Sequence, residues 1–86
     1  MKSNTIYAIK EELESAREKY GPFNSTHEAY AVLQEEVNEF WELVQGVVKF
    51  SDDDWKNDRM REELKQVAAI AIRIIEELEN KEIKWV

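Results

Sequence analysis

The sequence predicts an all-α fold, a helical bundle of two long helices and a shorter N-terminal helix. The 86-residue chain contains only 2 Gly and 1 Pro, so it offers few of the turns that a β-sandwich or β-barrel requires. Apolar residues recur at intervals of three and four along most of its length, which is the pattern of amphipathic helices. Because the chain has no Cys for disulfides or thiolate metal sites, we expect one helical domain over residues 1–86.

The first helix is predicted from about Asn4 to Tyr20, with Asn4 or Thr5 as its N-cap. Gly21 and Pro22 end it, because Gly accepts a left-handed cap and Pro cannot continue a helix. Its apolar positions share one helical face: Ile6, Ile9, Leu13, Ala16 and Tyr20.

The second helix is predicted to start at about Thr26, because Ser25 and Glu28 have the spacing of a capping box. It is expected to run to Lys49 or Phe50. Helical spacing predicts an inward-facing core stripe on it, formed by Leu33, Val37, Phe40 and Val44.

A loop is predicted at residues 51–57, where Asp52, Asp53 and Asp54 can cap the following helix. The third helix is expected from about Asn57 to Glu79, with Asn80 as its stop. Its predicted core stripe is the most apolar of the three: Leu64, Val67, Ala71, Ile75 and Leu78.

The charge balance excludes one large class of partners. The chain has 12 Lys and Arg against 19 Asp and Glu, a net charge of −7. A protein that holds a nucleic-acid polymer through its phosphates needs clustered cations, so we expect no such partner. No apolar run approaches the roughly 18 residues of a membrane helix, and the N-terminus is charged too early for a signal peptide. A cytoplasmic protein with no membrane contact is therefore expected.

The size of the chain predicts self-association. A domain of this length buries only about 60–65% of the surface of its unfolded chain. Helices with such apolar stripes would leave an exposed apolar patch on a monomer. We therefore expect a homodimer or homotetramer that completes the bundle.

Several carboxylates fall among apolar neighbours rather than on the wet face. Glu36 lies inside the edge of the apolar arc of the second helix, and Glu39 follows one turn later. On the third helix Glu63 lies among apolar neighbours, with Gln66 three residues on. Residues at i and i+3 share a helical face, so each pair can reach one cation. Buried carboxylates are costly unless they are paired or bound to a metal.

Two interpretations of these carboxylates remain open. Arg73 is expected to face solvent, and both it and Lys65 point away from Glu63, so no compensating base is evident. The side chains then either extend to water from the margin of the core or converge on a hard cation such as Mg²⁺, which prefers carboxylate oxygens.

The runs LQEEVNEFWELV and REELKQVAAIAIRIIEEL resemble the MazG-type, all-α nucleoside triphosphate pyrophosphohydrolases. The family pattern is Glu-x-x-Glu on one helix and Glu-x-x-Asp on the next. Glu36 and Glu39 match the first half, whereas the second half is Glu63 and Gln66, with Gln where the family has Asp. The resemblance covers roughly residues 25–78.

The resemblance implies an Mg²⁺-dependent enzyme, with Mn²⁺ as an alternative ion, that forms dimers or tetramers. Its substrate would be an NTP or dNTP, cleaved to the nucleoside monophosphate and pyrophosphate. Glu36, Glu39 and Glu63 would be metal ligands, and Gln66 can still coordinate through its carbonyl oxygen but without charge. Glu35 is a further candidate, for orienting or deprotonating the attacking water.

Other residues are candidates for holding the substrate. Lys49, Lys56 and Arg59 flank the loop between the two half-motifs, and phosphates need cationic partners. Trp55 is open to stacking on a base. For these residues, solubility and packing are the simpler interpretation. The same holds for Trp41, which we expect in the core or at a subunit interface.

His27 lacks the preceding Glu of a di-iron motif and is interpreted as a surface residue. The sequence therefore favours a nucleotide pyrophosphohydrolase. The alternative is a non-catalytic helical oligomerisation or protein-interaction module, a degenerate relative that binds nucleotide without hydrolysing it.

Overall fold

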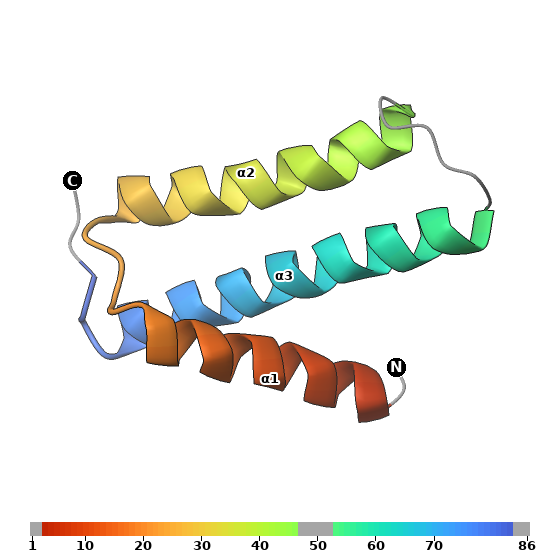
Figure 1. Ribbon diagram of the computed structural model, residues 1–86. Helices are drawn as coiled ribbons and strands as arrows, with labels where there is room; N and C mark the ends of the chain where they lie inside the picture. Colours follow the sequence, from red (N-terminus) through yellow and green to blue (C-terminus); the bar gives the residue numbers. More distant parts are fainter. Residues whose placement is uncertain (1–2, 47–52, 84–86) are drawn as a thin grey trace.

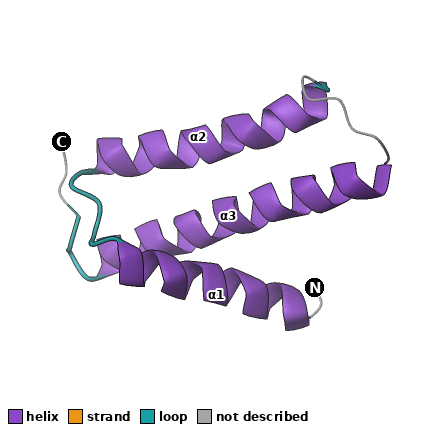
Figure 2. Ribbon diagram, viewed as in Figure 1, coloured by secondary structure: helices purple, strands orange, loops and turns teal. Residues whose placement is uncertain are grey.

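The computed structural model describes residues 3–46 and 53–83 (Figure 1). It contains α1 (Ser3–Lys19), α2 (Thr26–Gln45) and α3 (Asp53–Glu79). The described residues are helix, turn and loop without a strand (Figure 2), which confirms the all-α prediction. In this part of the chain, no helix combines the length and the apolar character needed to cross a bilayer.

Helix α3 is the centre of the arrangement. It lies between the other two helices in Figure 1, and both α1 and α2 pack on it while making no helix contact with each other in the described ranges. The core cluster consists of Phe23, Ala29 and Ile83, with Val32, Ile70 and Ile74 packed against it. Ile83, which follows α3, thus packs with residues of the α1–α2 connection and of α2.

The start of α2 follows the predicted cap in one half and departs from it in the other. The Ser25 Oγ accepts a hydrogen bond from the Glu28 N–H at 3.1 Å, as a capping residue should. The Glu28 carboxylate, however, accepts from the backbone N–H and the Nδ2 of Asn24, at 3.2 and 2.9 Å. It ties the α1–α2 connection to the helix instead of closing a reciprocal box.

Helix α2 ends earlier than predicted. It stops at Gln45, because Gly46 adopts the left-handed conformation (φ 77°) and its N–H reaches back to the carbonyls of Glu42 and Leu43. A glycine in this conformation is a common helix terminator, so extending the helix to Lys49 or Phe50 was wrong. Residues 47–50, including Lys49, lie outside the described residues.

Helix α3 starts earlier than predicted, at Asp53 rather than Asn57. Residues 53–57, predicted as loop, form its first turns, so Trp55 and Lys56 are helical. The acidic Asp54 is favourable there because negative charge is stabilised at a helix N-terminus. At the other end the Glu82 N–H donates to the Glu77 carbonyl at 2.9 Å, and Lys81 is left-handed (φ 57°), a Schellman-type stop just after Asn80.

Helix α1 agrees with its prediction to within one residue at each end. It begins at Ser3, so Asn4 and Thr5 lie within its first turn instead of capping it. Arg17 of α1 pairs with Glu76 of α3, which joins two helices far apart in sequence.

Arg73 was expected to face solvent, but it is only 8% exposed. Its Nη2 donates to the Gly21 carbonyl at 2.7 Å and its Nε to Glu77 at 3.0 Å. Its guanidinium also stacks on the Phe23 ring, 3.9 Å from the centroid. The α1–α2 connection folds over Arg73. Helical periodicity places Arg73 on the solvent side of α3, because periodicity takes no account of a segment outside the helix.

The predicted core stripes are largely exposed in the single chain. Val37, Val44 and Leu64 are exposed, as are Trp41 (55%) and Ile75 (54%). The buried α2 residues are Ala29 and Leu43, which lie on the side of the helix that carries Glu36. Helix α2 therefore turns the edge of its apolar arc to α3, and the centre of the arc remains uncovered.

Candidate metal centre

Three carboxylates from two helices converge at the α2–α3 contact. One oxygen of each of Glu36, Glu39 and Glu63 lies within 4.8 Å of the others. The helices bring them together because Glu36 and Glu39 are one turn apart on α2, and α3 packs along that side. The sequence prediction that these three side chains share a site is consistent with this geometry.

The cluster holds carboxylate oxygens that lack partners. Glu63 is only 2% exposed, and Glu36 is partly buried. The Oε2 atoms of Glu36 and Glu63 are buried and accept no hydrogen bond from the described residues. A buried acceptor without a partner costs free energy, and either a bound cation or a proton shared between the carboxyl groups would offset that cost.

Burial and mutual repulsion disfavour ionisation of the cluster. Burial raises the pKa of Glu36 from 4.5 to about 7, and the neighbouring Glu39 and Glu63 add to the rise. Burial also raises the pKa of Glu39, again with a contribution from Glu63. Raised pKa values in a group of neighbouring carboxyl groups mark a candidate functional site.

A cation of the chain itself reaches the cluster. The Nη2 of Arg59 donates to Oε1 of Glu63 at 2.9 Å, from four residues earlier on α3. The prediction that no basic residue compensates the charge of Glu63 was therefore wrong. It considered Lys65 and Arg73, whereas the compensating residue is Arg59, one turn earlier on α3. Arg59 had been predicted as a phosphate-binding residue, and in the structure it lies at the carboxylates.

The remaining predicted site residues divide into two groups. Gln66 and Glu36 line one cavity and lie at the same end of it. Glu35, Trp55 and Lys56 lie outside the carboxylate cluster; Glu35 and Trp55 are exposed and Lys56 is partly buried. Roles for these three residues in catalysis or substrate binding stay predictions.

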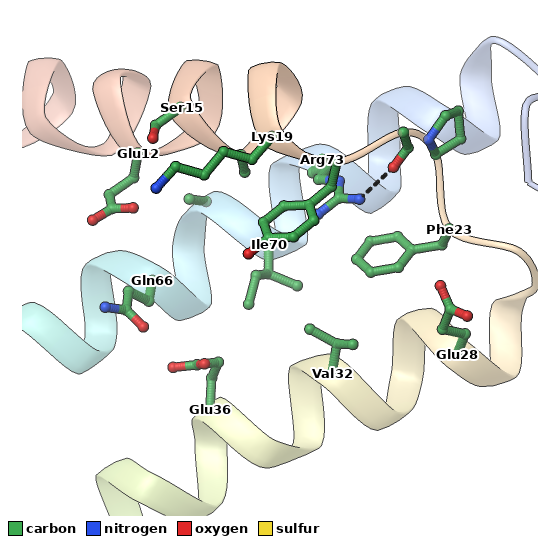
Figure 3. A pocket seen from close by; sticks show the side chains of 15 residues that line it. Glu12, Ser15, Lys19, Phe23, Glu28, Val32, Glu36, Gln66, Ile70 and Arg73 are labelled. Atoms are coloured by element: carbon green, nitrogen blue, oxygen red, sulfur yellow. Dashed lines mark hydrogen bonds between the residues drawn. The ribbon is translucent and has the colours of Figure 1, made fainter.

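A cavity of about 720 Å³ adjoins the cluster, between α1, α2 and α3. In Figure 3, Glu36 and Gln66 lie at one end of it with Glu12 and Lys19 of α1, whereas Phe23 and Arg73 lie at the other end. Val32 and Ile70 form an apolar stretch between the two ends. This volume lies within the usual range of about 300–1,000 Å³ for small-molecule pockets.

The contribution of α1 to this cavity was missed by the sequence reasoning. Glu12 and Lys19 fall on the polar face of an amphipathic helix, where nothing in the pattern separates them from solvated residues. For Arg59 a signal did exist, because Arg and Glu four residues apart on a helix are neighbours.

Comparisons with protein-family models, with curated proteins and with solved structures found no match for this chain. The geometry of the site therefore carries the functional argument.

Proposed function

We propose that this chain is a divalent-cation-dependent nucleotide pyrophosphohydrolase of the MazG-like type. In this proposal it cleaves an NTP or dNTP between the α and β phosphates to give the monophosphate and pyrophosphate. The observation that carries the proposal is the convergence of Glu36, Glu39 and Glu63 with two buried oxygens that lack partners. The resemblance of the two half-motifs supports it.

The donor set fits Mg²⁺, with Mn²⁺ as an alternative, because both ions accept carboxylate oxygens. When bound, the ion would neutralise phosphate charge and polarise the phosphorus that is attacked. Glu36, Glu39 and Glu63 would hold it, and the Gln66 carbonyl is within reach of the same region. The sequence prediction gives Glu35 the role of orienting or deprotonating the attacking water. Its side chain is exposed in the single chain, so this role requires that substrate or a second subunit cover it.

The cavity provides space for the rest of the substrate. Glu36 of the carboxylate cluster lines one end of it, and its middle is apolar at Val32 and Ile70. A nucleotide shows the same sequence of polar and less polar parts, because its charged phosphates adjoin a less polar nucleoside. We propose that the phosphates lie toward Glu36 and the nucleoside toward Phe23.

The test is release of pyrophosphate from a panel of NTPs and dNTPs with and without Mg²⁺. We expect Mg²⁺-dependent release from at least one member, and none from Glu36→Gln or Glu63→Gln. The matched controls are Glu42→Gln and Glu62→Gln, which remove exposed carboxylates from the same two helices and should leave the rate unchanged. Absence of release across the whole panel would refute the enzymatic proposal.

We also propose that a second copy of the chain covers the exposed apolar stripes of α2 and α3, giving a homodimer or homotetramer. Each stripe repeats at helical spacing: Val37, Trp41 and Val44 on α2, and Leu64, Ile75 and Leu78 on α3. Two antiparallel helices that expose such stripes can complete a four-helix bundle with an identical pair. The alternative function, a non-catalytic interaction module, would use the same surface.

Mass measurement by light scattering tests the assembly. We expect a dimer or tetramer for the unmodified chain and a monomer for Ile75→Glu. Tyr7→Glu is the matched control, because Tyr7 is equally exposed but lies on α1. A monomeric unmodified chain would contradict the assembly, and an oligomer that hydrolyses no nucleotide would favour the interaction module.

A further inference from the structure

The Arg59–Glu63 pair differs from the other described ion pairs of α3 because it joins a half-exposed guanidinium to a buried carboxylate. Arg59 donates to Oε1 of Glu63 at 2.9 Å, and that carboxylate is almost fully buried. Arg59 itself remains half-exposed. Its side chain therefore spans from solvent into the acidic cluster.

The charge of Arg59 acts on more than one carboxylate. Its positive charge also acts electrostatically on Glu39, a residue on the other helix of the cluster. One guanidinium thus acts on two of the three clustered carboxylates, and two of the three keep a buried oxygen without a partner among the described residues. A single positive charge offsets this cluster only in part.

A divalent cation and Arg59 would compete for the same carboxylate oxygens. The guanidinium of Arg59 already donates a hydrogen bond to Oε1 of Glu63. A divalent cation bound among the carboxylates would lie close to this guanidinium and would be repelled by its positive charge. Once released, the half-exposed guanidinium lies at the edge of a site that would hold phosphates. Arg pairs well with phosphate oxygens because its planar fork donates two parallel hydrogen bonds.

We propose that Arg59 is an exchangeable counter-cation: it partly offsets the charge of the carboxylate cluster in the cation-free chain and transfers to a phosphate group when the divalent cation binds. This inference rests on the proposed function, because it requires a cation site at Glu36, Glu39 and Glu63. It goes beyond that function in assigning one residue two successive partners.

The proposal predicts effects of opposite sign for a single substitution. Arg59→Gln removes the competitor, so Mg²⁺ alone should bind about three- to tenfold more tightly. The same variant lacks the phosphate partner, so inorganic pyrophosphate in saturating Mg²⁺ should bind about tenfold more weakly. Titration calorimetry measures both, and pyrophosphate is chosen because it carries no base or sugar.

Arg61→Gln is the matched control. Arg61 lies two residues away on the same helix, and its pair with Asp58 at 3.4 Å is exposed, so its removal should change neither affinity. Arg59→Lys keeps the charge but loses the planar fork, and it should lie between the unmodified chain and Arg59→Gln in both titrations. In thermal melts without a divalent cation, only Arg59→Gln of the three variants should have a lower Tm than the unmodified chain. Mg²⁺ should restore the Tm of this variant.

The outcomes separate the two proposals. If the unmodified chain binds no Mg²⁺, the proposed function and this inference both fail. If it binds Mg²⁺ but Arg59→Gln weakens both ligands or changes neither, only the exchange is overturned, because an ordinary structural ion pair would behave in that way. Should Arg59→Gln not fold, Arg59→Lys decides: equal affinities for both ligands in Arg59→Lys and the unmodified chain would contradict the proposal.

Discussion

Glu63 and Glu77 of α3 begin from the same local pattern and have different surroundings. Both are nearly buried, at 2% and 7% exposure, and each accepts a hydrogen bond from an arginine four residues earlier. Glu77 uses both of its oxygens, with Oε1 accepting from the Phe23 N–H at 2.8 Å and Oε2 from Arg73. Glu63 uses one oxygen, and its Oε2 has no partner in the described part of the chain.

The partners differ as well. Arg73 is buried, stacked on Phe23 and bonded to the Gly21 carbonyl, so the Glu77 region is a closed network. Arg59 is half-exposed, and two further carboxylates lie beside Glu63. A closed network stabilises the fold, whereas an open one with surplus negative charge is suited to binding. The comparison therefore separates a structural carboxylate from a functional one on a single helix.

The largest expected effect is the loss of stability on removing Glu77. Glu77→Ala leaves the buried Arg73 and the Phe23 N–H without their partner, and such losses cost about 3–5 kcal/mol. Glu63→Ala in the cation-free chain should cost about 1 kcal/mol or less, because its ion pair is half-exposed and its removal relieves repulsion from Glu36. Denaturant unfolding of both variants measures the difference, and equal losses would show that the two regions do not differ.

The second effect is stabilisation by Mg²⁺. A ligand present at 100 times its Kd stabilises the folded state by about 2.7 kcal/mol, so saturating Mg²⁺ should raise the Tm by roughly 10–20 °C. Glu63→Gln should abolish this rise, whereas Glu62→Gln, which removes the exposed neighbour, should retain it. A rise of the same size in Glu63→Gln would place the ion elsewhere.

The third effect is a pH dependence of the cation-free chain. The pKa of Glu36 is raised from 4.5 to about 7, so between these values the folded chain binds more protons than the unfolded chain. The free energy of unfolding of the chain must then fall as the pH rises from 5 to 8. We expect a loss of about 1 kcal/mol, because solvent screens a partly exposed carboxyl.

Thermal melts at successive pH values measure this slope in the presence of a chelator. Glu36→Gln should flatten it, whereas Glu42→Gln, which removes an exposed carboxyl from the same helix, should not. A stability that increases with pH over this range in the unmodified chain would contradict the assigned shift.

The smallest effect concerns Gln66. Gln66→Asp adds a negative charge beside Glu36 and restores the acidic residue of the family pattern, so Mg²⁺ should bind about threefold to tenfold more tightly. Gln34→Asp, an equivalent change on the exposed side of α2, is the control. Calorimetric titration distinguishes them, and an unchanged affinity in Gln66→Asp would remove Gln66 from the site.

Much of the fold was accessible from the sequence, but the packing faces were not. The starts of α1 and α2 followed from periodicity and from the Ser25 cap, because both depend on neighbours within one or two turns. The end of α2 was missed although Gly46 marks it, since an apolar pattern continuing to Val48 outweighed the single glycine. Trp41 and Ile75 have the pattern of core residues, yet the single chain leaves them exposed.

The candidate site was predictable to a similar degree. The choice of Glu36, Glu39 and Glu63 followed from their spacing and from apolar neighbours on the same helices. The cavity did not, because Glu12 and Lys19 come from α1, which carries no motif, and they meet Gln66 only through packing on α3.

The sequence by itself determined three helical segments and a few carboxylates that interrupt their apolar faces. Helix formation depends on hydrogen bonds and side chains within a few residues, so it can be deduced from short-range patterns. Only the tertiary structure decided that Glu77 is satisfied and Glu63 is not. That difference depends on the Phe23 N–H and the Gly21 carbonyl, which lie more than fifty residues away and reach α3 only once the chain folds back over it.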